Sequence, residues 1–265
     1  MTPSVETAIA AARGEGRAAL IGYLPAGFPS LEASLALVRT MVEAGADVVE
    51  VGLPYSDPVM DGPTIQAAAQ VALENGTRTT DIFDVVESVA ELAPTLVMTY
   101  WNPVERYGVE GFAASLASAG GAGLITPDLI PDEAAEWIAA ADRHDLDKVF
   151  LVAPSSTAQR LRMTAAASRG FVYATAVMGV TGAREQASEA APNLVARLRQ
   201  LTEQPVGVGL GVSSGDQAAG VAAYADAVIV GSAFVRSVQE AGPEGAVESV
   251  RELTRELARG VRREL

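Results

Sequence analysis

The sequence predicts a single (β/α)8 TIM barrel over residues 1–265, with an extra helix before the first strand. Eight short apolar segments alternate with longer Ala- and Leu-rich segments of helical pattern. This alternation indicates βαβ units, and strands that are apolar throughout are typical of a parallel sheet covered by helices. Eight units in a chain of 265 residues favour a closed barrel over an open doubly wound sheet. The open fold would carry a G-x-G-x-x-G turn after its first strand, where this chain reads GYLPAGFPS.

Each element is bounded by turn residues or by a change of periodicity. The predicted strands cover 18–24, 47–53, 95–100, 123–126, 148–153, 171–176, 206–210 and 226–231. The predicted helices cover 3–13, 30–44, 63–73, 79–92, 108–119, 131–142, 156–168, 190–202, 214–222 and 243–262. In such a barrel the active site lies at the carboxyl ends of the strands and in the loops that follow them.

Composition excludes several classes of function. The chain has 33 Asp and Glu against 19 Lys and Arg, a net charge of -14, which disfavours nucleic acid and anionic membranes as partners. It has no cysteine and one histidine, His144, so thiolate chemistry, a Ser-His-Asp triad and a metal site are not expected. The amino-terminal segment has no signal-peptide pattern and no apolar run is long enough to span a bilayer, so a cytoplasmic location is expected. Acid–base chemistry therefore falls to Asp, Glu, Tyr or Lys.

Glu50 interrupts an apolar strand, VVEVG, at residues 48–52. Side chains alternate along a strand, so Glu50 shares a face with Val48 and Gly52. If that face is the barrel interior, burial raises the pKa of the carboxyl and makes it a proton donor near neutral pH. The alternative is an outward Glu50 paired with a helix residue. Because helices cover that face too, an unpaired carboxylate is unfavourable there, and the inward interpretation is favoured.

Two aspartates follow in the loop PYSDPVMDGP. Asp57 is interpreted as a turn residue, since Asp favours turns and helix N-caps. For Asp61 a cap beside Pro63, which suits the first position of a helix, and a catalytic role are equally supported.

Three consecutive loops predict a phosphate site. MGVTGARE, GLGVSSGD and VIVGSAF follow the sixth, seventh and eighth strands, and their glycines let backbone N–H groups approach an anion. Gly231 and Ser232 begin a predicted short helix over 232–238, whose amino terminus favours negative charge. For each single loop, a plain tight turn stays an alternative.

The motifs EVGLPYSDPVMDGPTIQAA, YWNPVERYGVEGF, GLITPDLIPDEA, LVAPSSTAQRL, GFVYATAVMGVTGAR, VGLGVSS and DAVIVGSAFV run in order through almost the whole chain. This series closely resembles the tryptophan synthase alpha subunit family. The resemblance implies a lyase that cleaves indole-3-glycerol phosphate to indole and glyceraldehyde 3-phosphate by a retro-aldol step.

The resemblance also implies residue roles. Glu50 matches the family's catalytic glutamate and Asp61 its catalytic aspartate, with Tyr173 in support close to the reaction centre. The positions that match the phosphate site are Gly182, Gly211, Gly231 and Ser232. Tyr100 and Leu124 fall in the regions that line the indole pocket.

A partner is implied in the same way. The family works with a beta subunit that carries pyridoxal phosphate, in an alpha2-beta2 heterotetramer, and passes indole to it for L-tryptophan synthesis. The alpha chain itself is expected to bind no cofactor. Loops 54–62 and 178–188 resemble the elements that close the site and face the partner. The alternatives are a stand-alone indole-3-glycerol-phosphate lyase and a non-catalytic barrel that acts as an allosteric partner.

Overall fold

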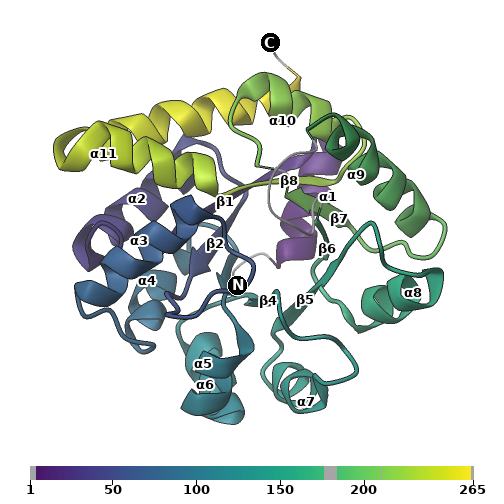
Figure 1. The fold of residues 1–265 in the computed structure, drawn as a ribbon, viewed down its shortest axis with the longest axis horizontal. Coiled ribbons are helices and arrows are strands. Elements are labelled where there is room, and N and C mark those ends of the chain that lie inside the picture. Colours follow the sequence, from purple (N-terminus) through teal and green to yellow (C-terminus); the bar gives the residue numbers. More distant parts are fainter. Residues whose placement is uncertain (1–3, 176–183, 210, 264–265) are drawn as a thin grey trace.

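A computed structural model of the chain describes residues 4–175, 184–209 and 211–263. All eight strands are parallel and close into a barrel in chain order, with β8 paired to β1 (Figure 1). The strands are β1 Ala19–Pro25, β2 Val48–Gly52, β3 Thr95–Met98, β4 Gly123–Thr126, β5 Asp147–Val152, β6 Val172–Thr175, β7 Val206–Gly209 and β8 Ala227–Val230. The predicted (β/α)8 barrel is confirmed.

Helices surround the barrel on the outside (Figure 1). They are α1 Val5–Gly14, α2 Leu31–Ala44, α3 Pro63–Glu74, α4 Asp81–Ala90, α5 Trp101–Tyr107, α6 Val109–Ser118, α7 Ala135–Arg143, α8 Ala158–Ala167, α9 Arg184–Arg199, α10 Gly215–Ala222 and α11 Ser232–Arg262. None of the helices in the described ranges combines the length and the apolar character needed to cross a bilayer.

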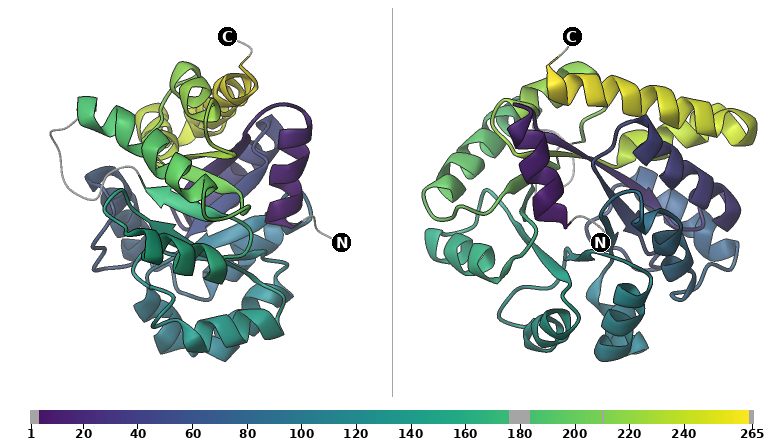
Figure 2. Two further views of the ribbon diagram at one scale, coloured as in Figure 1. Left: turned by 90° about the vertical axis from the view of Figure 1, so that its right-hand side faces the viewer. Right: turned by 180° about the vertical axis from the view of Figure 1, so that it is seen from behind.

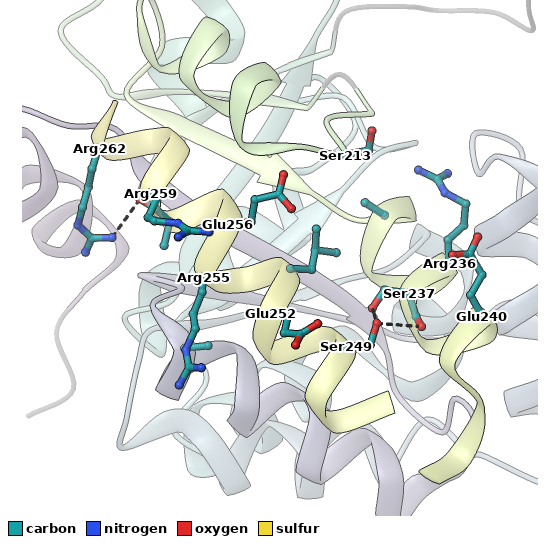
Figure 3. Close-up of a pocket in the computed structure, with 14 residues that line it drawn as sticks. Ser213, Arg236, Ser237, Glu240, Ser249, Glu252, Arg255, Glu256, Arg259 and Arg262 are labelled. Carbon is teal, nitrogen blue, oxygen red and sulfur yellow. Dashed lines mark hydrogen bonds between the residues drawn. The ribbon is translucent and has the colours of Figure 1, made fainter. Parts of the chain in front are cut away.

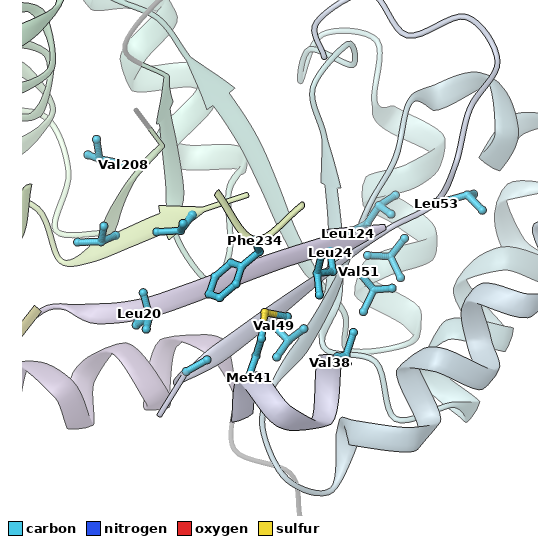
Figure 4. Packing of buried hydrophobic residues seen from close by; sticks show 14 of the residues in the cluster. Leu20, Leu24, Val38, Met41, Val49, Val51, Leu53, Leu124, Val208 and Phe234 are labelled. Carbon is cyan, nitrogen blue, oxygen red and sulfur yellow. The ribbon is translucent and has the colours of Figure 1, made fainter. Parts of the chain in front are cut away.

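The alternation of side chains along each strand divides the core into two layers. Val49 and Val51 of β2 point outward, into a large apolar layer between the sheet and the helices. Figure 4 shows part of that layer, with Met41 of α2 and Phe234 of α11 facing the strands. Val48 belongs instead to the cluster inside the barrel. Glu50, two residues further on, therefore points inward as predicted.

Helix α1 closes the amino-terminal end of the barrel. Its apolar side chains Val5, Ile9 and Ala12 are fully buried and belong to the same cluster as the inward residues of the strands. Seen from behind, α1 crosses in front of the strands (Figure 2, right). The extra helix predicted from the sequence thus seals the end of the barrel opposite to the one where the site is expected.

The structure differs from the predicted elements mainly in three places, one of which is α9, which begins at Arg184 where a start at residue 190 was predicted. The segment after β3, expected as a loop, forms helix α5, and Tyr100 is its N-cap residue. Helices 232–238 and 243–262 are joined in α11 across a kink at Gly242, whose φ of 65° suits glycine, with Pro243 next in the chain.

Candidate active site

A cavity of about 690 Å³ opens at the carboxyl ends of the strands. Its walls come from segments distant in the sequence: strands β1, β2, β3, β6, β7 and β8, the loops after β2, β7 and β8, and the starts of α3 and α11. The lining residues are Tyr23, Glu50, Met60, Asp61, Gly62, Pro63, Thr64, Ile65, Met98, Tyr173, Gly209, Gly211, Ile229, Gly231, Ser232 and Arg236. The barrel therefore brings Glu50, Asp61, Tyr173, Gly211, Gly231 and Ser232 to one cavity.

Glu50 lies at the bottom of this cavity. The residue is 1% exposed, and neither carboxyl oxygen has a hydrogen-bond partner among the described residues. Burial raises the pKa of Glu50 to about 8, because the charged form is poorly solvated there. At neutral pH the side chain is a protonated acid that has a proton to give.

Two tyrosines flank Glu50. Tyr23 pairs with Glu50 in the register of β1 and β2, and Tyr173 reaches the cavity from β6. A Cβ at position 52 would lie 2.3 Å from the Tyr23 hydroxyl oxygen, and one at position 209 would lie 2.4 Å from that of Tyr173. Gly52 and Gly209 thus make the room that the tyrosines occupy.

Both tyrosine hydroxyls stay protonated at neutral pH. Burial, together with the nearby carboxylates of Asp61 and Glu50, raises the pKa of Tyr23 well above its usual value. Burial and the charge of Glu50 raise the pKa of Tyr173 in the same direction. Each is therefore a neutral hydrogen-bond donor beside the acid.

Asp61 faces the cavity from the loop after β2. It does not cap α3, whose N-cap residue is Gly62 and whose cap carries no side-chain hydrogen bond, whereas Pro63 begins the helix as predicted. Burial raises the pKa of Asp61, and a hydrogen bond from the Tyr100 hydroxyl opposes that rise. The side chain is left to act on a ligand. Asp57, in contrast, is exposed and its carboxylate accepts a hydrogen bond of 2.5 Å from the Ser56 hydroxyl.

The Tyr100 hydroxyl holds this loop. Its oxygen accepts hydrogen bonds from the backbone N–H groups of Met60, at 2.9 Å, and of Asp61, at 3.1 Å. Tyr100 is nearly buried and burial raises its pKa to about 12, so the hydroxyl keeps its proton. Its ring packs on Tyr55 with 5.4 Å between centroids. Tyr100 thus supports the loop that carries Asp61 and is not itself among the residues that line the cavity.

Backbone groups gather at the other side of the cavity. Gly211 has a φ of 69°, a conformation that favours glycine, and no described atom lies within 4 Å of a Cβ added there. Gly231 is the N-cap residue of α11 and Ser232 its first residue, and no side chain caps this helix. Among the described residues, no side chain accepts from the first N–H groups of α11, and such groups favour an anion. Gly182 lies outside the described residues.

Comparison with known proteins agrees with this geometry. The family model described as Tryptophan synthase alpha chain matches residues 9–262. A tryptophan synthase alpha chain from Nocardia farcinica is 61% identical over 254 residues, 96% of this chain and 94% of that protein. One from Acidothermus cellulolyticus is 58% identical over 261 residues, 98% of this chain and 97% of that protein. The chain belongs to the tryptophan synthase alpha chain family.

Solved structures agree with the family. A chain of Mycobacterium tuberculosis tryptophan synthase superposes with a TM-score of 0.92 at 55% identity and covers 99% of both chains. The tryptophan synthase subunit alpha of Legionella pneumophila reaches 0.90 at 28% identity, with 99% of both chains covered. The predicted enzyme class is confirmed with the family: the chain is a lyase of the indole-3-glycerol phosphate half-reaction.

The predicted pocket residue Leu124 needs correction. Leu124 is fully buried on the outer face of β4, against the helices, and Figure 4 shows it among that layer. The inward residue of β4 is its neighbour Ile125. All four residues of GLIT are buried, so the sequence does not mark which of them faces the interior, and a shift of one residue exchanges the faces.

Two ionisable residues that line the cavity, Tyr23 and Arg236, were not predicted from the sequence. Tyr23 had a readable signal, since it shares a strand face with the inward residues Ala19 and Ile21 and stands at the carboxyl end of β1. Arg236 had none, because its approach to the cavity depends on where α11 begins. Within the described ranges, no group of three or more His, Asp or Glu side chains is placed to hold a metal ion.

Proposed function

We propose that Glu50 acts first as the acid and then as the base of indole-3-glycerol phosphate cleavage. The protonated carboxyl gives its proton to indole C3. The bond from C3 to the side chain then breaks, and its electrons restore the aromatic ring. The carboxylate takes the proton of the adjacent hydroxyl as the aldehyde forms, so Glu50 ends in its starting state.

Asp61 is proposed to bind the indole N–H. A carboxylate there stabilises the positive charge that develops on the ring nitrogen when C3 is protonated. Tyr173 is proposed to donate a hydrogen bond that holds Glu50 or the reacting hydroxyl, from its place beside Gly209. The observation that carries the proposal is that one cavity holds a second carboxylate and a buried acid with no hydrogen-bond partner in the described part of the chain.

The glycine-rich side of the cavity is proposed to hold the phosphate. Gly211, Gly231 and Ser232 line it, and Gly182, from the loop after β6, joins them on the strength of the family motif. Their backbone N–H groups and the amino terminus of α11 favour a dianion. In this arrangement the indole lies toward Asp61 and the phosphate toward α11. Residues from six strands and from α11 line one cavity, which supports one functional domain over residues 1–265.

A tryptophan synthase beta subunit that carries pyridoxal phosphate is the proposed partner, in an alpha2-beta2 heterotetramer, with indole passed to it for L-tryptophan synthesis. This chain itself is proposed to need no cofactor, and the family's biosynthetic role supports a cytoplasmic location. Apolar side chains stand exposed in two loops at the carboxyl ends of the strands, Val59 at 78%, Met60 and Ile130 at 41% each. Exposed apolar groups beside a site are typical of a protein interface.

One experiment separates the three readings of this chain. The chain is incubated with indole-3-glycerol phosphate, once alone and once with a tryptophan synthase beta subunit. The release of indole or of tryptophan is then measured over time. We expect slow release alone and a marked increase with the beta subunit. Full activity alone with no increase identifies a stand-alone lyase. No indole under either condition identifies a non-catalytic barrel and refutes the proposed chemistry.

A further inference from the structure

Arg236 is the one basic side chain among the described residues that line the cavity. It also lines a second, outer hollow of about 860 Å³ along the two parts of α11, between α11, α2 and the loop before α10. Figure 3 shows the residues that line this hollow, among them Arg236, which lines the cavity as well. Arg236 therefore stands in the wall between the site and the outside of the barrel.

The helix places Arg236 on the same face as the predicted phosphate site. Arg236 follows Ser232 by four residues, so the two side chains lie one turn apart on one face of α11. Side chains of a helix tilt toward its amino terminus, and here that terminus is Gly231 and Ser232. A guanidinium on this stem can reach a ligand that the first turn of α11 holds.

No described residue forms a hydrogen bond or an ion pair with the Arg236 guanidinium. Arg251, on the same helix, lies 3.5 Å from the Glu248 carboxylate, whereas Arg236 has no ion pair or hydrogen bond with any residue in the described ranges. Glu240 lies one turn further along, but Figure 3 shows the Arg236 side chain running away from it, with the guanidinium at the level of Ser213. The donors of Arg236 remain available.

The charge balance of the cavity favours a basic side chain near the phosphate. Asp61 is acidic and Glu50 is neutral while it is protonated, so neither contributes positive charge, and the whole chain carries -14. Backbone N–H groups offer partial charges that do not balance a phosphate dianion. The amino terminus of α10 is already used, because Gly215 N–H donates to the Glu256 carboxylate at 2.7 Å. The uncapped start of α11, with Arg236 behind it, is the positive end of the site.

We propose that Arg236 binds the substrate phosphate directly and makes the site selective for a phosphorylated glycerol chain over an unphosphorylated one. The inference rests on the proposed placement of the phosphate at α11. Arg236 donates a charge-assisted hydrogen bond to a phosphate oxygen, while Ser232 and the glycines position the rest of the group.

The test compares Arg236→Gln, Arg236→Lys and the matched control Glu240→Gln, which alters only the outer hollow. For each variant we would measure KM and kcat for indole-3-glycerol phosphate. We would also measure, by calorimetry, the Kd of two probes: glyceraldehyde 3-phosphate, which has the phosphate alone, and indole-3-propanol, which has the indole alone. Thermal unfolding checks that each variant is folded.

We expect Arg236→Gln to raise KM and the Kd of glyceraldehyde 3-phosphate about tenfold to a hundredfold, the range of one charge-assisted hydrogen bond. The Kd of indole-3-propanol and kcat stay within about threefold, Arg236→Lys recovers part of the loss, and Glu240→Gln matches the wild type. An unchanged Kd for glyceraldehyde 3-phosphate in Arg236→Gln, or an equal loss for both probes, overturns the inference. If the wild type releases no indole, the proposed reaction fails, yet the two binding constants still decide the role of Arg236.

Discussion

Carboxylates at the two ends of the barrel differ in whether they have hydrogen-bond partners. Residues 47–50, at and just before strand β2, include one carboxylate of each kind. Asp47, just before the strand, accepts two hydrogen bonds from the Arg17 guanidinium, at 2.7 and 2.8 Å, and one from Leu20 N–H at 2.8 Å. Glu50, near the other end, is more deeply buried and has no partner among the described residues. One carboxylate is satisfied and stabilises the fold, and the other is kept unsatisfied and available for chemistry.

The same contrast extends around the barrel. At the amino-terminal end, Asp147 pairs with Arg169 at 2.9 Å and Asp226 pairs with Arg199. Helix α1 seals that end with apolar side chains. The carboxyl end instead holds an open cavity with Glu50 and Asp61 and no arginine paired to either in the part of the chain that the structure describes. Stability and reactivity are thus assigned to opposite ends, as is usual for this fold.

The largest effect is expected from a substitution of Glu50, at the carboxyl end of the barrel. Glu50→Gln keeps the shape of the side chain and removes its transferable proton, so kcat for indole-3-glycerol phosphate is expected to fall by about 10²- to 10⁴-fold. The midpoint of thermal unfolding is expected to change little, because the carboxyl has no hydrogen-bond partner to lose among the described residues. Steady-state kinetics and calorimetry measure the two quantities. Near-normal turnover would remove Glu50 from the mechanism.

Asp47→Asn is the matched change at the other end of the same strand. The Arg17 side chain, which is 8% exposed, loses its main charged partner. The new amide NH₂ group also lies beside the Arg17 guanidinium and the Leu20 N–H, which are themselves donors. Loss of one partner of a buried pair leads us to expect a fall of about 2–4 kcal/mol in the free energy of unfolding. Turnover of the folded protein at 25 °C should match the wild type. A variant that loses turnover while its stability is unchanged would reverse the assignment of the two ends.

The sequence was sufficient for the features that local periodicity determines. Alternation along 48–52 was enough to place Glu50 inside, because Val48 and Gly52 share its face. The succession of apolar strands and helices was enough for the barrel. The sequence was not sufficient for Leu124, because every residue of its strand is apolar or small and no alternation shows which side chains point inward.

Contacts between distant segments explain why Tyr23 was omitted and why the role of Tyr100, which was predicted as a pocket residue, was not foreseen. Tyr23 flanks Glu50 through the register of β1 with β2, and Tyr100 holds residues 60–61 from about forty positions away. The inward face of Tyr23 can be read from its own strand, but its place beside Glu50 and the contacts of the Tyr100 hydroxyl cannot be read from the local sequence. Arg236 likewise depends on where α11 begins relative to the cavity. The sequence located the reacting groups, and the groups that position them required the fold.

The pH dependence of activity provides a further comparison between Glu50 in β2 and Asp47 just before it. Burial raises the pKa of Glu50 to about 8, and the acid form is the one that protonates indole. The fraction of that form falls as pH rises past the pKa, so kcat/KM is expected to fall about tenfold per pH unit above pH 8. Asp47→Asn should show the same profile, and the residual activity of Glu50→Gln should lack this limb. A kcat/KM that stays level up to pH 10 would contradict a Glu50 proton donor.

The smallest expected effect concerns the support of Asp61. Tyr100→Phe keeps the aromatic ring and removes the oxygen that accepts the N–H groups of Met60 and Asp61. Each lost hydrogen bond costs about 0.5–1.5 kcal/mol, less where water replaces it, so KM is expected to rise about threefold to tenfold. Tyr107→Phe is the control, because its hydroxyl lies 3.2 Å from Ser115 on the outer surface, and it should leave KM unchanged. If Tyr100 acted only by its ring, as a wall of the indole pocket, Tyr100→Phe would behave like the control. A rise in KM confined to Tyr100→Phe would show that the hydroxyl orders the loop carrying Asp61, and that the reactive end relies on hydrogen bonds as the other end relies on ion pairs.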